Sequence, residues 1–241
     1  MSDRLDVLAI GAHPDDVELG CGATVALMAS RDRRVGILNL TSGEMGTRGT
    51  PQERRQEAES AGRVLGAAAV LFLDCGDGGL RTGEAQVDAV IEVLRQHRPE
   101  LIFGPAPRDR HPDHERGHRL VHEACFYSGL RRRGNGEPHR PAAVYSYMQN
   151  DPFDPSFVVD VSATWEVKLA ALDEYRSQLH QPGQQREEPG TKVSSPAFRE
   201  AVTGRARHFG TLIGAEFGEP FWSRLPLSVG DPWALRPRRL R

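Results

Sequence analysis

Short apolar segments alternate with helix-length segments over the first half of this 241-residue chain. Four apolar segments have the length and composition of buried strands, and they cover residues 5–12, 34–41, 70–74 and 101–105. Helical patterns occupy the intervals at about residues 22–31, 51–65 and 84–98. This alternation favours right-handed crossovers. We therefore expect an α/β, Rossmann-like fold, in which a mainly parallel sheet carries helices on both faces.

The second half of the chain loses this regular alternation. A fourth helix at about 115–127 is followed by a segment rich in Arg, Gly and Pro, residues 131–141, which we expect to lie on the surface. Further on, the patterns predict strands at 143–148 and 157–161, helices at 164–179 and 196–208, and a polar loop at 181–190. No segment has the composition of an interdomain linker. We expect a single domain over residues 1–241, with a frayed tail from about residue 230 to 241.

Charge, hydropathy and cysteine usage exclude several classes of protein. Lys and Arg number 31 against 33 Asp and Glu, so the net charge of -2 provides no basic field for nucleic acid. The apolar residues 7–12 are too few to span a bilayer and lack the flanks of a signal peptide, so we expect a cytoplasmic protein without a membrane partner. Cys21, Cys75 and Cys125 fit neither a disulfide framework nor paired metal ligands, and we expect them to be buried.

Polar segments follow each of the first four predicted strands. They are Ala12-His13-Pro14-Asp15-Asp16, then residues 42–49, then residues 74–79, and finally Arg108-Asp109-Arg110-His111-Pro112-Asp113-His114. In an open parallel sheet, ligands bind beyond the carboxyl ends of the strands. Two clusters of His and Asp therefore approach one crevice from separate strands.

Three of these residues form a set suited to a catalytic metal. His13, Asp16 and His114 provide two imidazoles and one carboxylate, a common ligand set for a Zn²⁺ ion that keeps one position open for water. Asp15 is then a free carboxylate beside the metal-bound water, where a general base is needed.

Two further residues of the second cluster complete a hydrolytic site. His111 is expected across the metal as a cationic or proton-donating group, and Asp113 is expected to orient it. Two structural alternatives remain open at this point. Asp15 and Asp16 have the residue type of an N-cap and a first-turn acid of the following helix. His114, His118 and His122 have the spacing of one solvated helix face.

A rival metal motif overlaps the second cluster. His114-Glu115-Arg116-Gly117-His118 matches H-E-x-x-H, in which two histidines one helical turn apart bind zinc and the Glu is the base of a metalloprotease. This alternative leaves the residues from His13 to Asp16 without a role. A dinucleotide-binding loop is excluded, because Val25 stands where G-x-G-x-x-G requires a small residue after Gly20-Cys21-Gly22. A binding protein without catalysis is the third class, and a metal assay would distinguish it.

With these motifs in place, the chain resembles the zinc-dependent N-acetylglucosamine deacetylases related to the phosphatidylinositol-glycan L protein (PIG-L/LmbE-like). The resemblance rests on residues 12–16, the Gly-rich helix start at 20–24 and residues 110–114, and it extends over nearly the whole chain. The helix containing Arg54 and Glu57, together with Tyr175-Arg176-Ser177-Gln178, is most similar to the bacillithiol-pathway branch. That branch deacetylates N-acetylglucosaminyl malate.

The resemblance implies a role for each residue of the site. It implies that His13, Asp16 and His114 bind Zn²⁺, that Asp15 is the general base, and that His111 is the acid or oxyanion-stabilising group with Asp113 as its partner. It also implies a sugar contact for Arg54, whose alternative is a solvated helix arginine. The expected enzyme is a metal-dependent N-deacetylase that acts on a small GlcNAc conjugate and assembles as a homo-oligomer. Other GlcNAc conjugates remain alternative substrates, and either His111 or Asp15 could protonate the leaving amine.

Overall fold

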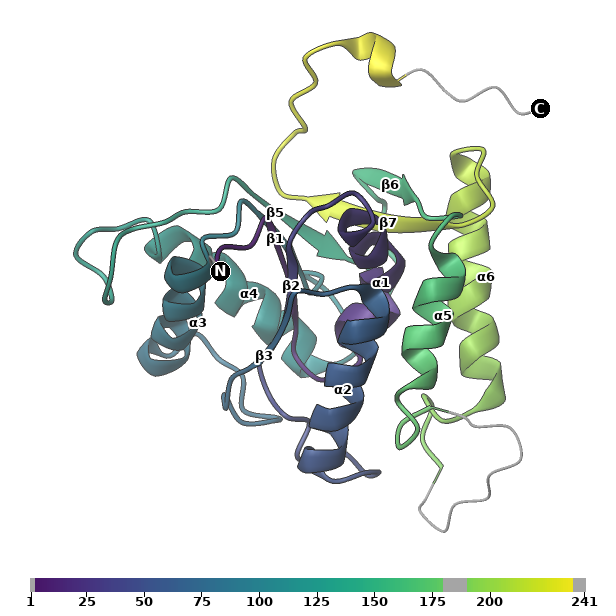
Figure 1. Ribbon diagram of the computed structural model, residues 1–241, viewed down its shortest axis with the longest axis horizontal. Coiled ribbons are helices and arrows are strands. Elements are labelled where there is room, and N and C mark those ends of the chain that lie inside the picture. The colour runs from purple at the N-terminus through teal and green to yellow at the C-terminus, as the bar shows by residue number, and fades with distance from the viewer. Residues whose placement is uncertain (1–2, 180–189, 236–241) are drawn as a thin grey trace.

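The computed structural model describes residues 3–179 and 190–235. Its centre is a seven-stranded sheet with the order β3-β2-β1-β4-β5-β7-β6 (Figure 1). The strands are β1 (Val7–Gly11), β2 (Val35–Asn39), β3 (Ala69–Phe72), β4 (Leu101–Gly104), β5 (Ala143–Tyr147), β6 (Phe157–Asp160) and β7 (Gly218–Ser223). The helices are α1 (Asp16–Ala29), α2 (Pro51–Leu65), α3 (Glu84–His97), α4 (Pro112–Tyr127), α5 (Trp165–Asp173) and α6 (Pro196–Leu212), with a short 3₁₀ turn at Pro232–Leu235.

The sheet is mainly parallel, as predicted. Strand β1 pairs in parallel with β2 and β4, β2 with β3, and β4 with β5. Strand β7 is antiparallel to both of its neighbours, β5 and β6. The carboxyl ends of β1, β2, β3 and β4 therefore meet at one edge of the sheet, where the polar loops emerge.

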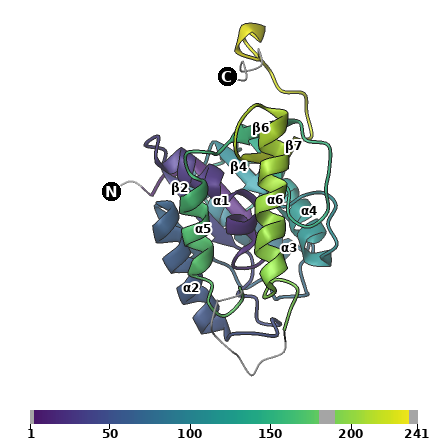
Figure 2. The same cartoon turned by 90° about the vertical axis from the view of Figure 1, so that its right-hand side faces the viewer.

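Helices cover both faces of the sheet, which confirms the expected α/β class. Figure 1 shows α3 and α4 on one side and α1, α2, α5 and α6 on the other. The first face buries Leu120 and Ile91 against Leu8 and Leu38, and the second buries Val17 and Ala58 against Ile37. A third cluster joins α1, α5 and α6, which lie side by side in Figure 2. The three cysteines are free and buried, as expected.

Local signals fix the helix that follows the second loop. Thr50 caps α2: its side chain accepts a hydrogen bond from the N–H of Glu53, and the Glu53 carboxylate accepts one from the N–H of Thr50. Pro51 occupies the first turn, and Gly66 ends the helix with a φ of 77°. The predicted bounds of this helix are confirmed.

Five elements differ from the sequence prediction. Helix α4 begins at Pro112, three residues before the expected start at about 115, and helix α6 extends to Leu212 rather than ending at about 208. Helix α1 begins at Asp16, six residues before the expected start at residue 22, and it is interrupted at Cys21. Helix α5 ends at Asp173, and turns replace the rest of the expected helix. Strand β7 was not predicted, because Gly218 and Pro220 weaken its strand pattern. Most of the loop predicted at 181–190 and the Arg-rich end, residues 236–241, lie outside the described residues.

No helix in the described part of the chain is both long and apolar enough to cross a membrane.

Candidate functional site

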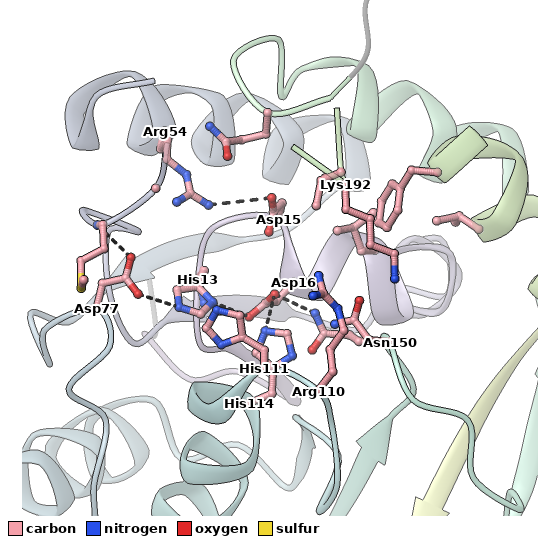
Figure 3. Close-up of a pocket in the computed structure, with 18 of the residues that line it drawn as sticks. His13, Asp15, Asp16, Arg54, Asp77, Arg110, His111, His114, Asn150 and Lys192 are labelled. Carbon is pink, nitrogen blue, oxygen red and sulfur yellow. Dashed lines mark hydrogen bonds and ion pairs between the residues drawn. The ribbon is translucent and has the colours of Figure 1, made fainter. Parts of the chain in front are cut away.

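A pocket of about 500 Å³ opens at the carboxyl ends of β1 to β4 (Figure 3). The loops predicted to meet there contribute its floor, and helix α6 with the segment before it contributes one wall. Its polar lining includes His13, Asp15, Asp16, Arg54, Asp77, Arg110, His111, His114, Gln149 and Lys192. The prediction that the two His/Asp clusters approach one crevice is therefore confirmed.

Asp16 contacts both histidines of the expected metal set. Its Oδ2 accepts a hydrogen bond from the backbone N–H of His13 (2.9 Å) and lies 3.5 Å from His13 Nδ1. Its Oδ1 lies 3.2 Å from His114 Nε2. All three side chains are buried. Burial alone would raise the pKa of Asp16, but the charges and hydrogen bonds of His114 and His13 outweigh it and hold that pKa well below its ordinary value.

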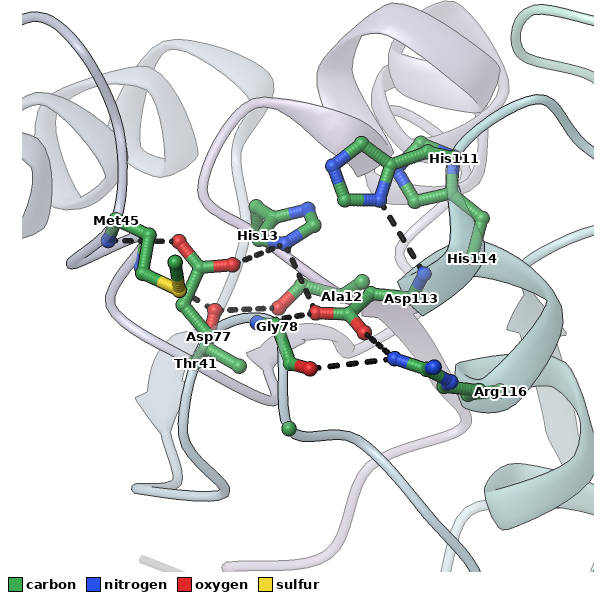
Figure 4. A network of polar contacts seen from close by, with 12 residues as sticks. Ala12, His13, Thr41, Met45, Asp77, Gly78, His111, Asp113, His114 and Arg116 are labelled. Carbon is green, nitrogen blue, oxygen red and sulfur yellow. Dashed lines mark hydrogen bonds and ion pairs between the residues drawn. The ribbon is translucent and has the colours of Figure 1, made fainter.

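The second nitrogen of each histidine is held by a carboxylate. His114 Nδ1 lies 3.0 Å from Asp109 Oδ1. His13 Nε2 lies 2.9 Å from Asp77 Oδ1 and 3.7 Å from Asp113 Oδ2 (Figure 4). Carboxylates in this position fix the tautomer and orientation of metal-ligating imidazoles. The nitrogens that face Asp16 are therefore the ones that a neutral ring would offer to a metal ion as electron-pair donors.

The chemistry of this donor set fits a divalent metal ion. Ligand atoms of His13, His111 and His114 lie within 4.8 Å of one another, and so do those of His13, Asp77 and Asp113. The carboxylate of Asp16 lies beside the first of these clusters, because it contacts both His13 and His114. One carboxylate and two imidazoles form an arrangement suited to Zn²⁺, because the ring nitrogen of each imidazole that faces away from the site is already bonded to another carboxylate.

Asp15 occupies the N-cap position of α1, but its side chain makes no capping hydrogen bond within the described chain. Its φ is 101°, in the left-handed region that non-glycine residues rarely adopt. Burial raises the pKa of Asp15 to about 7, against the lowering effect of the Arg54 guanidinium, whose Nη2 lies 3.8 Å from Asp15 Oδ2. The structural alternative therefore gave the right positions, since Asp15 is the N-cap residue and Asp16 lies in the first turn of α1, but within the described residues Asp15 does not make the capping hydrogen bond that would explain its residue type.

Arg54 is buried, so the alternative of a solvated helix arginine is wrong. Its guanidinium donates to the carbonyl of Gly43 and to the carbonyl of Pro14, both at 2.8 Å. It also lines the pocket. Arg54 thus ties the loop after β2 to the loop that carries His13 and Asp15.

His111 presents one ring nitrogen to the pocket. Its Nδ1 accepts a hydrogen bond from the backbone N–H of Asp113 (3.3 Å), so the neutral ring carries its proton on Nε2. Burial lowers the pKa of His111, and the nearby His13 and His114 lower it further. The sequence predicts a cationic or proton-donating group here, and this environment favours a neutral donor.

Asp113 orients His111 through its backbone rather than through its carboxylate, which corrects the expected pairing. The carboxylate accepts hydrogen bonds from the N–H of Gly78 (2.6 Å) and from Arg116 Nη1 (3.1 Å), and it faces His13. Figure 4 shows this carboxylate turned toward Gly78 and Arg116. The carboxylate of Asp113, which we expected to contact His111, therefore faces His13 instead.

The H-E-x-x-H alternative is not supported by the geometry. His118 Nδ1 lies 3.0 Å from the carbonyl oxygen of Pro105, and its ring packs against those of His122 and Trp222. Neither His118 nor Glu115 belongs to a potential metal-ligand group among the described residues. The predicted histidine face also divides, because His114 lines the pocket while the rings of His118 and His122 contact each other in a tilted arrangement.

Three polar residues of the site were missed from the sequence: Asp109 and Gln149 are buried, and Asp77 is partly buried. Asp77 and Asp109 hold the two histidines, and Gln149 Nε2 donates to Asp16 Oδ1 at 2.7 Å. Asp77 and Asp109 lie in loops that the strand-end argument singled out, so position was a usable signal for them. Gln149 follows β5, and no sequence signal marks it as a residue of the site.

Comparison with known proteins places the chain among amide hydrolases. The sequence profile described as "PIG-L: GlcNAc-PI de-N-acetylase" matches residues 8–125. Diacetylchitobiose deacetylase of Thermococcus kodakarensis is 31% identical over 196 residues, which are 74% of this chain and 72% of the relative. The crystal structure of the conserved protein TT1542 of Thermus thermophilus has 40% identity and a TM-score of 0.86, with 95% of this chain and 98% of that chain covered.

One relative carries out a different reaction. The 4-oxalmesaconate hydratase of Pseudomonas putida is 27% identical over 191 residues, which are 72% of this chain and 74% of the relative. Sequence similarity thus extends beyond deacetylases alone, while the family profile and the relative with the higher identity are both named for deacetylation. On these grounds, this chain belongs to the PIG-L family of de-N-acetylases.

Proposed function

We propose that this PIG-L deacetylase is a zinc-dependent hydrolase of N-acetylglucosamine conjugates and that its preferred substrate is N-acetylglucosaminyl malate. The observation that carries the proposal is the contact of Asp16 with both His13 and His114, beside the carboxylate of Asp15. The substrate class is supported by the names of the family profile and of the chitobiose deacetylase. Arg110 and Lys192 line the same pocket, and their charges suit the carboxylates of a malate end.

The proposed ligands are His13, Asp16 and His114. A zinc ion held there would supply a Lewis acid for the acetamide carbonyl and lower the pKa of water toward about 7. Asp77 and Asp109 keep the two imidazoles in the ligating orientation. These carboxylates, rather than the ligands alone, define the geometry of the site.

Asp15 acts as the general base in this proposal. A pKa of about 7 matches the task of taking a proton from water at neutral pH and returning it later. The carbonyls of Gly43 and Pro14 hold the guanidinium of Arg54 next to this carboxylate, which limits the movement of the base. The proton that Asp15 gains is then available to the leaving nitrogen.

His111 stabilises the developing oxyanion in this proposal. Its Nε2–H is a donor because Nδ1 is engaged by the N–H of Asp113. A donor placed on the oxyanion typically contributes about 10²- to 10³-fold in rate. Because the pKa of His111 is lowered and its ring is neutral, protonated Asp15 rather than His111 is the proposed source of the proton for the amine.

A substrate panel tests the proposal. Purified zinc-loaded protein is incubated with N-acetylglucosaminyl malate, an N-acetylglucosaminyl inositol, diacetylchitobiose, a peptide library and an unsaturated dicarboxylate that a hydratase would hydrate. We expect acetate release that is fastest with the malate conjugate. Peptide cleavage would favour the H-E-x-x-H protease, water addition without acetate would favour a hydratase, and faster turnover of another conjugate would reassign the substrate.

Three further expectations stay predictions. They are a homo-oligomeric assembly, a cytoplasmic location, and a single deacetylase domain over residues 1–241. Gel filtration with light scattering checks the first, and fractionation of the native host checks the second. Limited proteolysis checks the third.

A further inference from the structure

Helix α1 is broken immediately after the turn that carries Asp16. Cys21 has non-helical backbone angles (φ -144°, ψ 23°), so the helix consists of a first turn and a longer second segment. In an uninterrupted helix the N–H of Ala23 would donate to the carbonyl of Leu19, and the N–H of Thr24 to that of Gly20. The break leaves buried backbone groups that need other partners.

A buried ion pair supplies these partners. The carboxylate of Glu219, on β7, accepts hydrogen bonds from the N–H of Ala23 (3.2 Å) and from the N–H and hydroxyl of Thr24 (2.7 and 2.6 Å). Lys168, on α5, donates from Nζ to the carbonyl of Leu19 (3.0 Å) and lies 2.6 Å from Glu219 Oε1. The pair thus takes the place of the helical bond between Ala23 and Leu19: Glu219 accepts from the N–H of Ala23, and Lys168 donates to the carbonyl of Leu19.

Two more elements secure the same break. Arg205, on α6, donates from Nη2 to the carbonyl of Leu19 (3.2 Å) and from Nη1 to the carbonyl of Gln149. Gln149 in turn donates to Asp16 Oδ1. On the other face of the first turn, a Cβ at Gly20 would collide with the Tyr147 ring, so this turn packs tightly on β5.

The ion pair does nothing within the proposed reaction, since both side chains are almost fully buried and neither lines the pocket. Buried ion pairs contribute little net stability compared with apolar residues of similar volume. Both residues also lie outside residues 8–125, the segment that the family profile matches. Their contacts with the backbone on both sides of the break fix the direction of the first turn of α1. The direction of this turn sets the position of the Asp16 carboxylate.

We propose that Glu219 and Lys168 are positioning residues for the metal site, which act through the break in α1. This inference rests on the proposed zinc site. Helices α5 and α6 and strand β7, all from the last third of the chain, thereby hold the N-terminal ligand motif in its binding geometry (Figure 2). Loss of the acceptor at position 219 should let the first turn move and weaken metal binding.

A matched pair of double variants tests this inference. Lys168→Met/Glu219→Gln and Lys168→Met/Glu219→Leu both remove the two charges with little change in volume, but only the first keeps an acceptor for the N–H groups of Ala23 and Thr24. The Zn²⁺ dissociation constant is measured by chelator competition. We expect the Gln variant to bind within about threefold of wild type and the Leu variant to bind at least about tenfold more weakly, the lower end of outer-sphere effects.

Ile91→Ala is the control for a general loss of stability, because Ile91 is fully buried on α3, against the other face of the sheet. It should lower the melting temperature and leave zinc affinity unchanged. Equal zinc affinity of the Leu and Gln variants would overturn the inference, as would an equal loss of affinity in Ile91→Ala.

Amide hydrogen exchange of the metal-free proteins separates this inference from the proposed function. We expect faster exchange over residues 16–24 in the Leu variant than in the Gln variant. Unchanged exchange there would overturn the positioning role whether or not the protein binds zinc. Failure of the wild-type protein to bind Zn²⁺ would instead overturn the proposed function.

Discussion

Asp109 provides the sharpest test of how the site is organised. Its carboxylate is buried and contacts His114 Nδ1 (3.0 Å), the backbone N–H of His111 (2.9 Å), and the backbone and side-chain amides of Asn150 (2.9 and 3.0 Å). Burial would raise the pKa of Asp109, but these donors outweigh it and keep the group ionised. Asp109→Asn preserves the shape and removes the charge.

The expected cost follows from the bonds that change. An amide oxygen at the Oδ1 position still accepts from His114, but without a full negative charge, and the NH₂ group then faces the N–H of Asn150. Hydrogen bonds to charged groups contribute about 1.5–3 kcal/mol. At about 1.4 kcal/mol per tenfold, loss of one such bond weakens metal binding by roughly 10- to 150-fold, in line with the usual effect of about 10- to 100-fold for outer partners of metal ligands.

Chelator competition with Zn²⁺ measures the affinity of Asp109→Asn, and kcat/KM at saturating metal shows whether turnover recovers. Asp88→Asn is the matched control, because Asp88 pairs with Arg133 (2.8 Å) at the surface of α3, away from the pocket. We expect unchanged zinc affinity in the control. A dissociation constant for Asp109→Asn within about threefold of wild type would refute the inference that this carboxylate prepares His114 for the metal.

Four further results are expected. Asp16→Ala should lose most bound zinc while His118→Ala retains it by mass spectrometry, because His118 faces the carbonyl of Pro105; the reverse result would support the protease. Asp15→Asn should keep zinc and lower kcat at least about 10²-fold, so near wild-type acetate release would place the base elsewhere. Arg54→Lys keeps only one of two carbonyl contacts and should lower kcat/KM by about 1–3 kcal/mol with normal zinc content, whereas a change under twofold would exclude the contact. Burial, with the charges of His118 and Arg224, lowers the pKa of His122 from 6.5 to about 4. The unfolded chain therefore binds the extra proton, and stability is lost as pH falls from 6.5 toward 4. His122→Gln should show a smaller loss in urea midpoint over that range, and an equal loss would disprove the assignment.

The elements that sequence predicted well are those whose signals are local. The sequence predicts both ends of helix α2 correctly, because Pro51 is its first residue and Gly66 is its C-cap. The first four strands were placed because each is a short, almost wholly apolar segment between turn signals. In both cases the determining contacts are a few residues apart.

Helix α1 and strand β7 depend on contacts that are distant in the chain. The first turn of α1 contains Asp16 and Glu18, and the segment after the break at Cys21 is bonded by Glu219, which lies 195 residues from Thr24 in the sequence. Strand β7 contains Gly218 and Pro220, yet it pairs on both sides and contributes Phe221 to the core. Each feature supports the other, and neither is visible in its own segment.

The residue types of the site were predictable, whereas the pairing of its carboxylates was not. Asp109 and Asp113 lie within five residues of His114, and composition gives no reason to assign one rather than the other to a particular ring. The start of α4 decides the assignment. Because the helix begins at Pro112, Asp113 lies in its first turn, where its N–H reaches His111 and its carboxylate turns to Gly78 and His13. Asp109 remains in the preceding loop and reaches His114 from outside the helix. The sequence pattern suggested a helix that starts three residues later. Asp113 would then lie outside the helix, without the first-turn position from which its N–H reaches His111 and its carboxylate reaches Gly78.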